Sequence, residues 1–243
     1  MDVLSFAQPA LAVVGAGIIS SLAVDRGLPF LPALFLAIFL TGFLSLVIER
    51  TFLRPMVGEP VFSVAVLTIG IDILLRTFLD SWIGINPRYL GDPFPNYGTL
   101  GSVNIGGINL KYLEIAALIT AIVLIAILSI FFKRSKYGVA MRATSFDQEA
   151  ALAQGINVGR IFGLVWFIGA MLACISGFFI TGGFNGLTQG SYVAALRALP
   201  AVVIGGLDSL VGAIVGSLII GLTQGYIGCL LYTSDAADEG LGV

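Results

Sequence analysis

Long apolar runs separated by short polar connectors constrain the fold of this chain more than any other feature. A helix needs about 20 mostly apolar residues to cross the hydrocarbon core of a bilayer. In lipid, backbone N–H and C=O groups must pair within the segment, so such runs fold as helices. We therefore predict an all-α, polytopic transmembrane helix bundle with about six visible spans. The expected spans are residues 10–24, 28–48, 61–79, 112–132, 161–181 and 198–226.

Composition excludes several classes of protein. Hydrophobic residues make up 58% of the chain and charged residues 11%, whereas a soluble domain carries about 25% charged residues. The net charge of −2 argues against a nucleic-acid partner, so the lipid bilayer is the expected environment. The absence of histidine removes His-dependent catalytic triads, HExxH metalloproteases and most zinc sites. No lysine follows a glycine, so the chain has no Gly-Lys-Ser/Thr phosphate loop and is not expected to be an ATPase or to hold a cofactor.

One short polar segment between two spans has the pattern of a separate helix. Ser145 is positioned to cap its first turn, with Gln148 as the capping-box partner three residues later. Glu149 then lies near the positive end of the helix dipole. Gly155 follows as an expected left-handed stop. The pattern predicts a short helix that ends at Gly155.

The same segment carries a ridge of mostly small side chains. Phe146, Ala150 and Ala153 fall at helical spacing on one face, with Ala151 beside them. A narrow ridge of this kind suits the groove of a partner protein. The alternative is a surface helix that only joins two spans.

The string Glu149-Ala150-Ala151, followed by three residues and Gly155, resembles the EAA motif of ABC-importer permeases. The resemblance implies a cytoplasmic coupling helix that docks on a separate ATPase through Phe146, Glu149, Ala150, Ala151, Ala153 and Gly155. The more distal Ile-x-Leu-Pro element of those permeases is absent, and Val-Trp-Phe-Ile stands at 165–168 instead. That departure is usual in the branched-chain amino acid permeases.

Two further stretches resemble the branched-chain amino acid permeases. Phe6-Ala7-Gln8 is similar to a Phe-Ala-x-Gly element in which broken backbone lines the transport pathway, although Pro9 replaces the glycine. Residues 201–213 resemble a late segment of the family and contain Gly205 and Gly206, where many glycines indicate tight helix contacts or a broken helix. Together these stretches extend the resemblance over most of residues 4–226.

This resemblance implies a permease subunit of an ATP-driven importer in the bacterial inner (plasma) membrane. The expected partners are a second permease subunit, ABC ATPase subunits that bind the ATP, and an extracytoplasmic substrate-binding protein. Branched-chain or related amino acids are the expected substrates, and urea or short-chain amides are the alternative within the family.

Asp72 and Arg76 lie one helical turn apart within an apolar run. A charge in the middle of a membrane costs about 2.5–3.5 kcal/mol on insertion scales, and i,i+4 spacing lets the two charges partly neutralise each other. One interpretation is a polar point on the translocation pathway. The other is an interfacial ion pair near the outer end of the span.

Two other classes of protein remain as alternatives. An intramembrane aspartyl protease using Asp72 and Asp208 requires a Gly-x-Gly-Asp site, but Leu207 precedes Asp208. A secondary transporter or channel without ATP is the other alternative, and Asp72 and Arg76 are the residues that would serve it.

Positive charges in the connectors predict the orientation. Residues 80–111 form a long loop in which 102–105 and 108–111, joined by Gly106-Gly107, have the pattern of a small β-hairpin. Residues 182–197 are expected to be a glycine-rich loop on the same side as this hairpin. Connectors 49–60 and 133–160 hold Arg50, Arg54, Lys133, Arg134, Lys136, Arg142 and Arg160, and the opposite loops hold only Arg26, Arg88, Lys111 and Arg197. The positive-inside rule therefore predicts a cytoplasmic coupling segment and an external hairpin.

The two ends of the chain depart from the pattern of the middle. In the permeases that the chain resembles, a helix precedes the element that Phe6-Ala7-Gln8 is similar to. Residues 1–229 are therefore predicted to be a permease domain that lacks its first helix. Residues 230–243 turn abruptly acidic and resemble translated adapter sequence. We expect this tail to be non-native.

Overall fold

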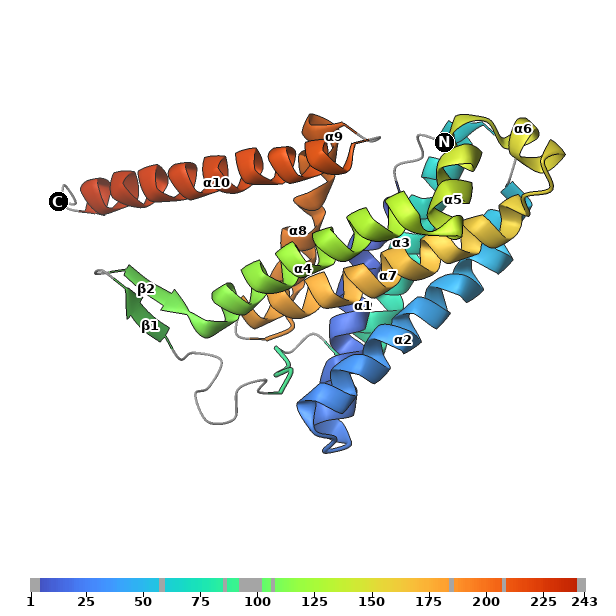
Figure 1. The fold of residues 1–243 in the computed structure, drawn as a ribbon. Helices are drawn as coiled ribbons and strands as arrows, with labels where there is room; N and C mark the ends of the chain where they lie inside the picture. The colour runs from blue at the N-terminus through green and yellow to red at the C-terminus, as the bar shows by residue number, and fades with distance from the viewer. Residues whose placement is uncertain are drawn as a thin grey trace. The chain divides into compact units, whose positions relative to one another are not determined.

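The computed structural model describes residues 5–56, 60–84, 87–91, 102–105, 108–183, 186–206 and 209–239 (Figure 1). The chain divides into two compact units, Val3–Ala195 and Leu196–Val243. The long helices of the first unit are α1 (Gln8–Ser20), α2 (Phe30–Ile48), α3 (Val61–Ile83), α4 (Tyr112–Arg134) and α7 (Val158–Gly183). Its shorter helices are α5 (Lys136–Phe146), α6 (Gln148–Ala153) and α8 (Gln189–Leu196). The second unit contains α9 (Ala198–Gly205) and α10 (Leu210–Glu239).

Among the described residues, six helical segments are long and apolar enough to cross a membrane. They are Gln8–Asp25, Phe30–Met56, Phe62–Trp82, Tyr112–Arg134, Val158–Gly182 and Val211–Gly228. The prediction of a polytopic helical bundle with about six spans is therefore confirmed. Hydrophobic length is a local property of the sequence, so it locates the first five spans closely, whereas the sixth candidate span begins at Val211 and not at residue 198.

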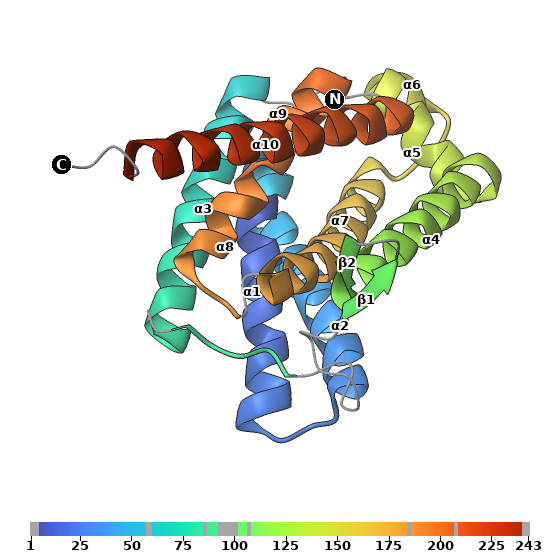
Figure 2. The same ribbon diagram turned by 90° about the vertical axis from the view of Figure 1, so that its left-hand side faces the viewer.

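The core of the first unit lies around α1. Figure 2 shows α1 between α3 and α7, and α1 also packs against α2. Small residues allow α1 and α7 to approach closely: a Cβ added at Gly15 would lie 2.8 Å from the Cys174 side chain, and one added at Gly177 would overlap the Ala12 carbonyl. Gly177 thus allows a backbone-to-backbone contact between α1 and α7, which is the packing that small residues favour in membranes.

The connector predicted at 49–60 is partly helical. The helical backbone of α2 continues through a π-helical turn, η2 (Glu49–Leu53), and a 3₁₀ turn, η3 (Arg54–Met56). The hydroxyl of Ser45 donates a 2.9 Å hydrogen bond to the carbonyl of Trp166, which ties α2 to α7 one turn before η2. Glu49 is consequently buried instead of lying in a polar loop.

The predicted β-hairpin is confirmed. Strand β1 (Ser102–Ile105) pairs antiparallel with β2 (Ile108–Lys111), with Ser102 opposite Lys111. The predicted turn at Gly106-Gly107 lies outside the described residues. α3 continues to Ile83, four residues beyond the predicted end of its span.

Residues 87–91 pack over the end of α1. The Ser20 hydroxyl donates a 2.7 Å hydrogen bond to the Tyr89 carbonyl. The Arg88 guanidinium forms a 2.9 Å ion pair with Asp25, in the π-helical turn η1 (Ser21–Asp25), and the Arg88 backbone bridges to Leu187. This end of the first unit thus gathers the loops that are predicted to be external.

The glycine-rich loop predicted at 182–197 contains a helix, so that prediction is wrong. The Ser191 hydroxyl accepts a 3.2 Å hydrogen bond from the backbone N–H of Thr188, and the Ser191 N–H donates to the Thr188 carbonyl. These bonds close a turn at the beginning of α8, after which Val193 and the alanines at 194–195 sustain the helix. Gly190 lies inside this helix, and because glycine has a low helix propensity, the sequence of this segment favoured a loop.

The single span predicted at 198–226 is divided in the second unit. Gly206 has φ +89° and ends α9, and α10 then packs back against α9. Gly205 and Gly212 touch through their backbones, and Gly216 lies against the carbonyl of Ala201. The glycines therefore both break the helix and allow the two halves to pack closely. α10 continues to Glu239, through most of the predicted tail, and Leu207 and Asp208 lie outside the described residues.

Candidate functional site

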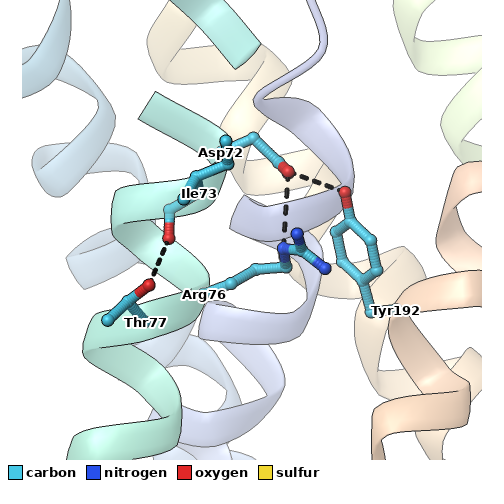
Figure 3. Close-up of polar contacts among 5 residues, drawn as sticks. All are labelled: Asp72, Ile73, Arg76, Thr77 and Tyr192. Carbon is cyan, nitrogen blue, oxygen red and sulfur yellow. Dashed lines mark hydrogen bonds and ion pairs between the residues drawn. The ribbon is translucent and has the colours of Figure 1, made fainter. Parts of the chain in front are cut away.

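Asp72, Arg76 and Tyr192 form a polar cluster in the first unit (Figure 3). The Tyr192 hydroxyl, on α8, donates a 2.7 Å hydrogen bond to Oδ2 of Asp72, on α3. The same oxygen lies 3.5 Å from Nε of Arg76. The Arg76 guanidinium carbon is 4.1 Å from the centroid of the Tyr192 ring, in cation–π geometry. One aromatic residue thus contacts both charges.

The cluster does not lie at the end of a span. Asp72 is halfway along α3, within the candidate span Phe62–Trp82. Asp72 is only 5% exposed, whereas the side chain of Arg76 is 43% exposed. The outer-end ion pair considered from the sequence does not match this position, because α3 extends further than the apolar run suggested.

This arrangement satisfies one side of a buried carboxylate. Oδ2 of Asp72 has two partners, whereas Oδ1 has no hydrogen-bond partner among the described residues. Since an unpaired polar group is costly at this depth, the Tyr192 hydrogen bond and the nearby Arg76 guanidinium lower the cost of burying the Asp72 side chain. The cluster joins α3 to α8 and leaves one carboxylate oxygen for a further partner.

The predicted pathway residues Phe6, Ala7 and Gln8 lie just before and at the start of α1, which packs against α3, the helix that carries Asp72. The backbone N–H of Phe6 donates a 3.3 Å hydrogen bond to the hydroxyl of Thr68, which lies one turn before Asp72 on α3. Ala7 is completely buried at the N-cap of α1, and the helix begins at Gln8. The helix was expected to begin after Pro9, but proline fits the first turn because the N–H it lacks has no partner there.

Gly205 and Gly206, the other predicted pathway residues, belong to the second unit. They form the break and the close backbone contact described above for α9 and α10. Tyr192 was not predicted from the sequence, because it stands in a stretch expected to be a loop.

The coupling segment forms a separate short helix, α6, but with a different cap from the one predicted. Asp147 has extended backbone angles of φ −152° and ψ 113°, and its side chain accepts a 3.0 Å hydrogen bond from the N–H of Ala150. Ser145 instead lies inside α5, where its hydroxyl bonds to the carbonyl of Arg142 at 2.8 Å. The Ser145 prediction is wrong because α5 continues through Phe146, so the helix break falls at Asp147.

The predicted stop at Gly155 is confirmed. Gly155 has φ +79°, its N–H donates to the Leu152 carbonyl at 2.9 Å, and the Ile156 N–H donates to the Ala151 carbonyl at 3.0 Å. These two bonds make a Schellman motif, in which a left-handed residue closes the helix.

The predicted docking ridge is divided between two helices. Phe146 ends α5 and is 91% exposed, while Glu149, Ala150 and Ala153 are exposed on α6. Ala151 is 4% exposed and therefore packs within the first unit. The exposed face of α6 therefore carries Ala150 and Ala153, while Ala151 packs against the rest of the first unit.

The family model described as "Branched-chain amino acid transport system / permease component" matches residues 1–238. The chain belongs to this family. The resemblance found in the sequence is therefore confirmed, and the protein is a multi-pass transport component of the bacterial inner membrane.

Several curated permeases of this family are similar to the chain over most of its length. It is 26% identical over 235 residues to the high-affinity branched-chain amino acid permease BraD of Pseudomonas aeruginosa, covering 93% of this chain and 76% of BraD. It is 28% identical over 188 residues to LivH of Escherichia coli, covering 76% of this chain and 61% of LivH. The probable LivH of Methanocaldococcus jannaschii is 22% identical over 229 residues, covering 93% of this chain and 72% of that protein. No solved structure matches the chain.

Proposed function

We propose that this permease component is the membrane subunit of an ATP-driven importer of branched-chain amino acids. The observation that carries the proposal is the exposed α6 helix with its Glu149-Ala150-Ala151 sequence and Gly155 stop, in a chain of the branched-chain amino acid permease family. BraD and LivH are named as permease proteins of high-affinity branched-chain amino acid transport systems. Such a substrate for this chain is consistent with those relatives.

The arrangement of the first unit supports a cytoplasmic position for α6. A Cβ added at Gly159, at the start of α7, would lie 2.7 Å from the Arg54 guanidinium, so the end of α2 and the start of α7 meet at one end of the unit. α5 and α6 also contact α7. The connectors richest in Lys and Arg thus gather at one end, as the positive-inside rule requires of a cytoplasmic face.

The packing of α6 suggests how ATPase movement would reach the spans. Its outer face presents Ala150 and Ala153, while Ala151 is buried and the Schellman motif leads directly toward α7. A displacement of α6 by the ATPases would therefore be passed to α7 through packed backbone. The proposed complex contains a second permease subunit, ATP-binding ATPase subunits and an extracytoplasmic substrate-binding protein.

Reconstitution of the complete importer tests this function. The chain would be purified with the ATPase, second permease and binding-protein subunits of the proposed complex, and radiolabelled leucine uptake into liposomes would be measured with and without ATP. We expect ATP-dependent leucine uptake that excess isoleucine or valine inhibits and urea does not. Inhibition by urea or short-chain amides alone would identify the alternative substrate class. Uptake that does not require ATP would contradict the importer mechanism.

A further inference from the structure

A carboxylate is buried at the Arg-rich end of α2. Glu49, the first residue of η2, is 4% exposed, and its Oε1 atom has no hydrogen-bond partner among the described residues. In the described part of the chain it also forms no ion pair with Lys or Arg. The charges of Arg54 and Arg50 act on this carboxylate, but a buried carboxylate oxygen without a hydrogen-bond partner is disfavoured, so Oε1 calls for a cationic or hydrogen-bonding ligand.

A cavity of about 240 Å³ lies beside Glu49. Since one water occupies about 30 Å³ of liquid, the cavity has room for a small organic molecule. Most of its wall is apolar and comes from η2, η3, α3 and α7. The apolar lining residues are Leu53, Met56, Val64, Phe162, Val165 and Trp166.

The remaining polar groups of the cavity complement a zwitterion. Ser5 and Gln8 line it together with Glu49, and the buried Ser5 hydroxyl has no partner among the described residues. A Cβ added at Gly169 would lie 3.1 Å from Nε2 of Gln8, so this glycine leaves space for the Gln8 amide. The amide and the hydroxyl can donate to a ligand carboxylate, while Glu49 can only accept when ionised.

The nearby arginines lie along a different hollow. Arg50, Arg54 and Arg160 line a groove of about 370 Å³ that shares Glu49 with the cavity, whereas none of the described residues that line the cavity itself is an arginine or lysine. A ligand cation that approaches Glu49 from the cavity therefore meets fewer positively charged side chains of the protein than one that approaches from the groove.

We propose that this cavity binds a small amino acid, with Glu49 holding its ammonium group. Gln8 and Ser5 donate to its carboxylate, and the apolar wall around Trp166 holds its aliphatic side chain. The inference rests on the proposed transport function and names a binding site for its substrate near the predicted cytoplasmic exit.

Cysteine modification in the complete importer tests the site. Cys174→Ala and Cys229→Ser provide a cysteine-free chain, and Met56→Cys places one thiol in the wall of the cavity. In detergent, its reaction would be timed with cationic aminoethyl and anionic sulfonatoethyl methanethiosulfonate. Because Glu49 attracts cations, we expect the ratio of cationic to anionic rates to exceed that of free cysteine by about tenfold or more. Leucine should slow the reaction, and 4-methylpentanoate, which lacks the ammonium group, should not.

Substitutions at position 49 connect these effects with the carboxylate. Glu49→Gln should remove the preference for the cationic reagent and the protection by leucine, whereas Glu49→Asp should keep the preference. Glu114→Gln, which neutralises an exposed glutamate on α4, should change neither result.

The measurements in the Met56→Cys protein test the binding site even if the Glu49→Gln variant does not insert into the membrane. Equal normalised rates for the two reagents would contradict an ionised Glu49 at the cavity. Absence of leucine protection in a complex that imports leucine would overturn the site while leaving the transport function intact. A complex that imports no leucine would instead refute the proposed function, and the reagent-charge comparison would still test Glu49.

Discussion

The hydroxyl of Tyr192 donates a 2.7 Å hydrogen bond to Asp72, a residue 120 positions earlier in the chain. The ring of the same tyrosine lies under the Arg76 guanidinium. A short helix outside the predicted spans is thereby attached to the middle of α3. Each polar group in the cluster has a neighbour that lowers the cost of placing it among apolar helices.

Removing the hydroxyl alone should weaken this attachment. Tyr192→Phe retains the ring over Arg76 but takes the donor from a buried carboxylate, which costs about 1–3 kcal/mol. In a chain of this size, that loss lowers the thermal midpoint by roughly 2–4 °C per kcal/mol. Thermal unfolding of the purified protein in detergent, at one fixed scan rate, measures the shift.

Tyr226→Phe is the matched control because Tyr226 is largely exposed on α10. It should leave the midpoint unchanged. An equal shift in both variants would show that the Asp72 hydrogen bond is not what stabilises the first unit.

Glycine-to-alanine substitutions at two different positions should have opposite effects on the stability of the protein. Gly177→Ala places a methyl group against the Ala12 carbonyl, and overpacking of this kind costs about 1–3 kcal/mol. Gly70→Ala meets no atom within 4 Å and replaces a glycine in the interior of α3, so it should stabilise by about 0.5–1 kcal/mol. Thermal midpoints of the two variants provide the test. If both move in the same direction, contact between α1 and α7 does not set the effect.

The spans and the hairpin were predictable because their signals are local. Hydrophobic length identifies a span, and two short strands around Gly106-Gly107 identify a hairpin, without knowledge of the rest of the chain. The stop at Gly155 was equally local, since a glycine after a helical segment favours the left-handed conformation.

The missed features depend on residues that are distant in sequence or on competition between neighbours. Tyr192 has a role because α8 lies beside α3, and Glu49 is buried because α2 continues past its apolar run against α7. Ser145 and Asp147 are both good caps, and the choice between them depends on where α5 ends. Such choices are made by tertiary packing, which a single sequence does not display.

Bulk on the exposed face of α6 should uncouple the importer. We expect Ala150→Trp to abolish stimulation of ATP hydrolysis by the loaded binding protein, because overpacking a fitted contact costs about 1–3 kcal/mol. Glu149→Gln keeps the shape and removes a charge worth about 0.3–1 kcal/mol near a helix start, so it should only reduce stimulation. The ATPase rate of the reconstituted complex is measured with and without the binding protein.

Ala126→Trp adds the same indole to an exposed alanine of α4 and serves as the control for added bulk. Its stimulation should remain at the wild-type level. Full stimulation of the Ala150→Trp complex would exclude α6 as the docking element.

The C-terminal end of α6 should tolerate substitution no better. Gly155→Val puts a β-branched residue at φ +79°, a conformation that such residues rarely adopt. The Schellman bonds would be lost, and the chain would leave α6 in a different direction from the one that leads into α7. We expect stimulated ATP hydrolysis to be abolished although the protein still inserts, as membrane fractionation would show. Wild-type stimulation would mean that the geometry of this turn is not required.

Labelling of single cysteines should establish the orientation. With the native cysteines replaced, Asn109→Cys in β2 should react with a membrane-impermeant maleimide added to intact cells. Gln148→Cys in α6 should react only after the cell membrane has been permeabilised. The reverse pattern would contradict the orientation predicted from the Lys and Arg distribution.

The contact between α1 and α7 has a mechanical consequence for a transporter. Gly15 meets Cys174 and Gly177 meets the Ala12 carbonyl with no spare room. A slide of one helix past the other by a single residue, about 1.5 Å, would drive side chains onto the backbone. The two helices therefore move together as one rigid body. Any alternation between outward and inward access requires movement at contacts between other helices of the bundle.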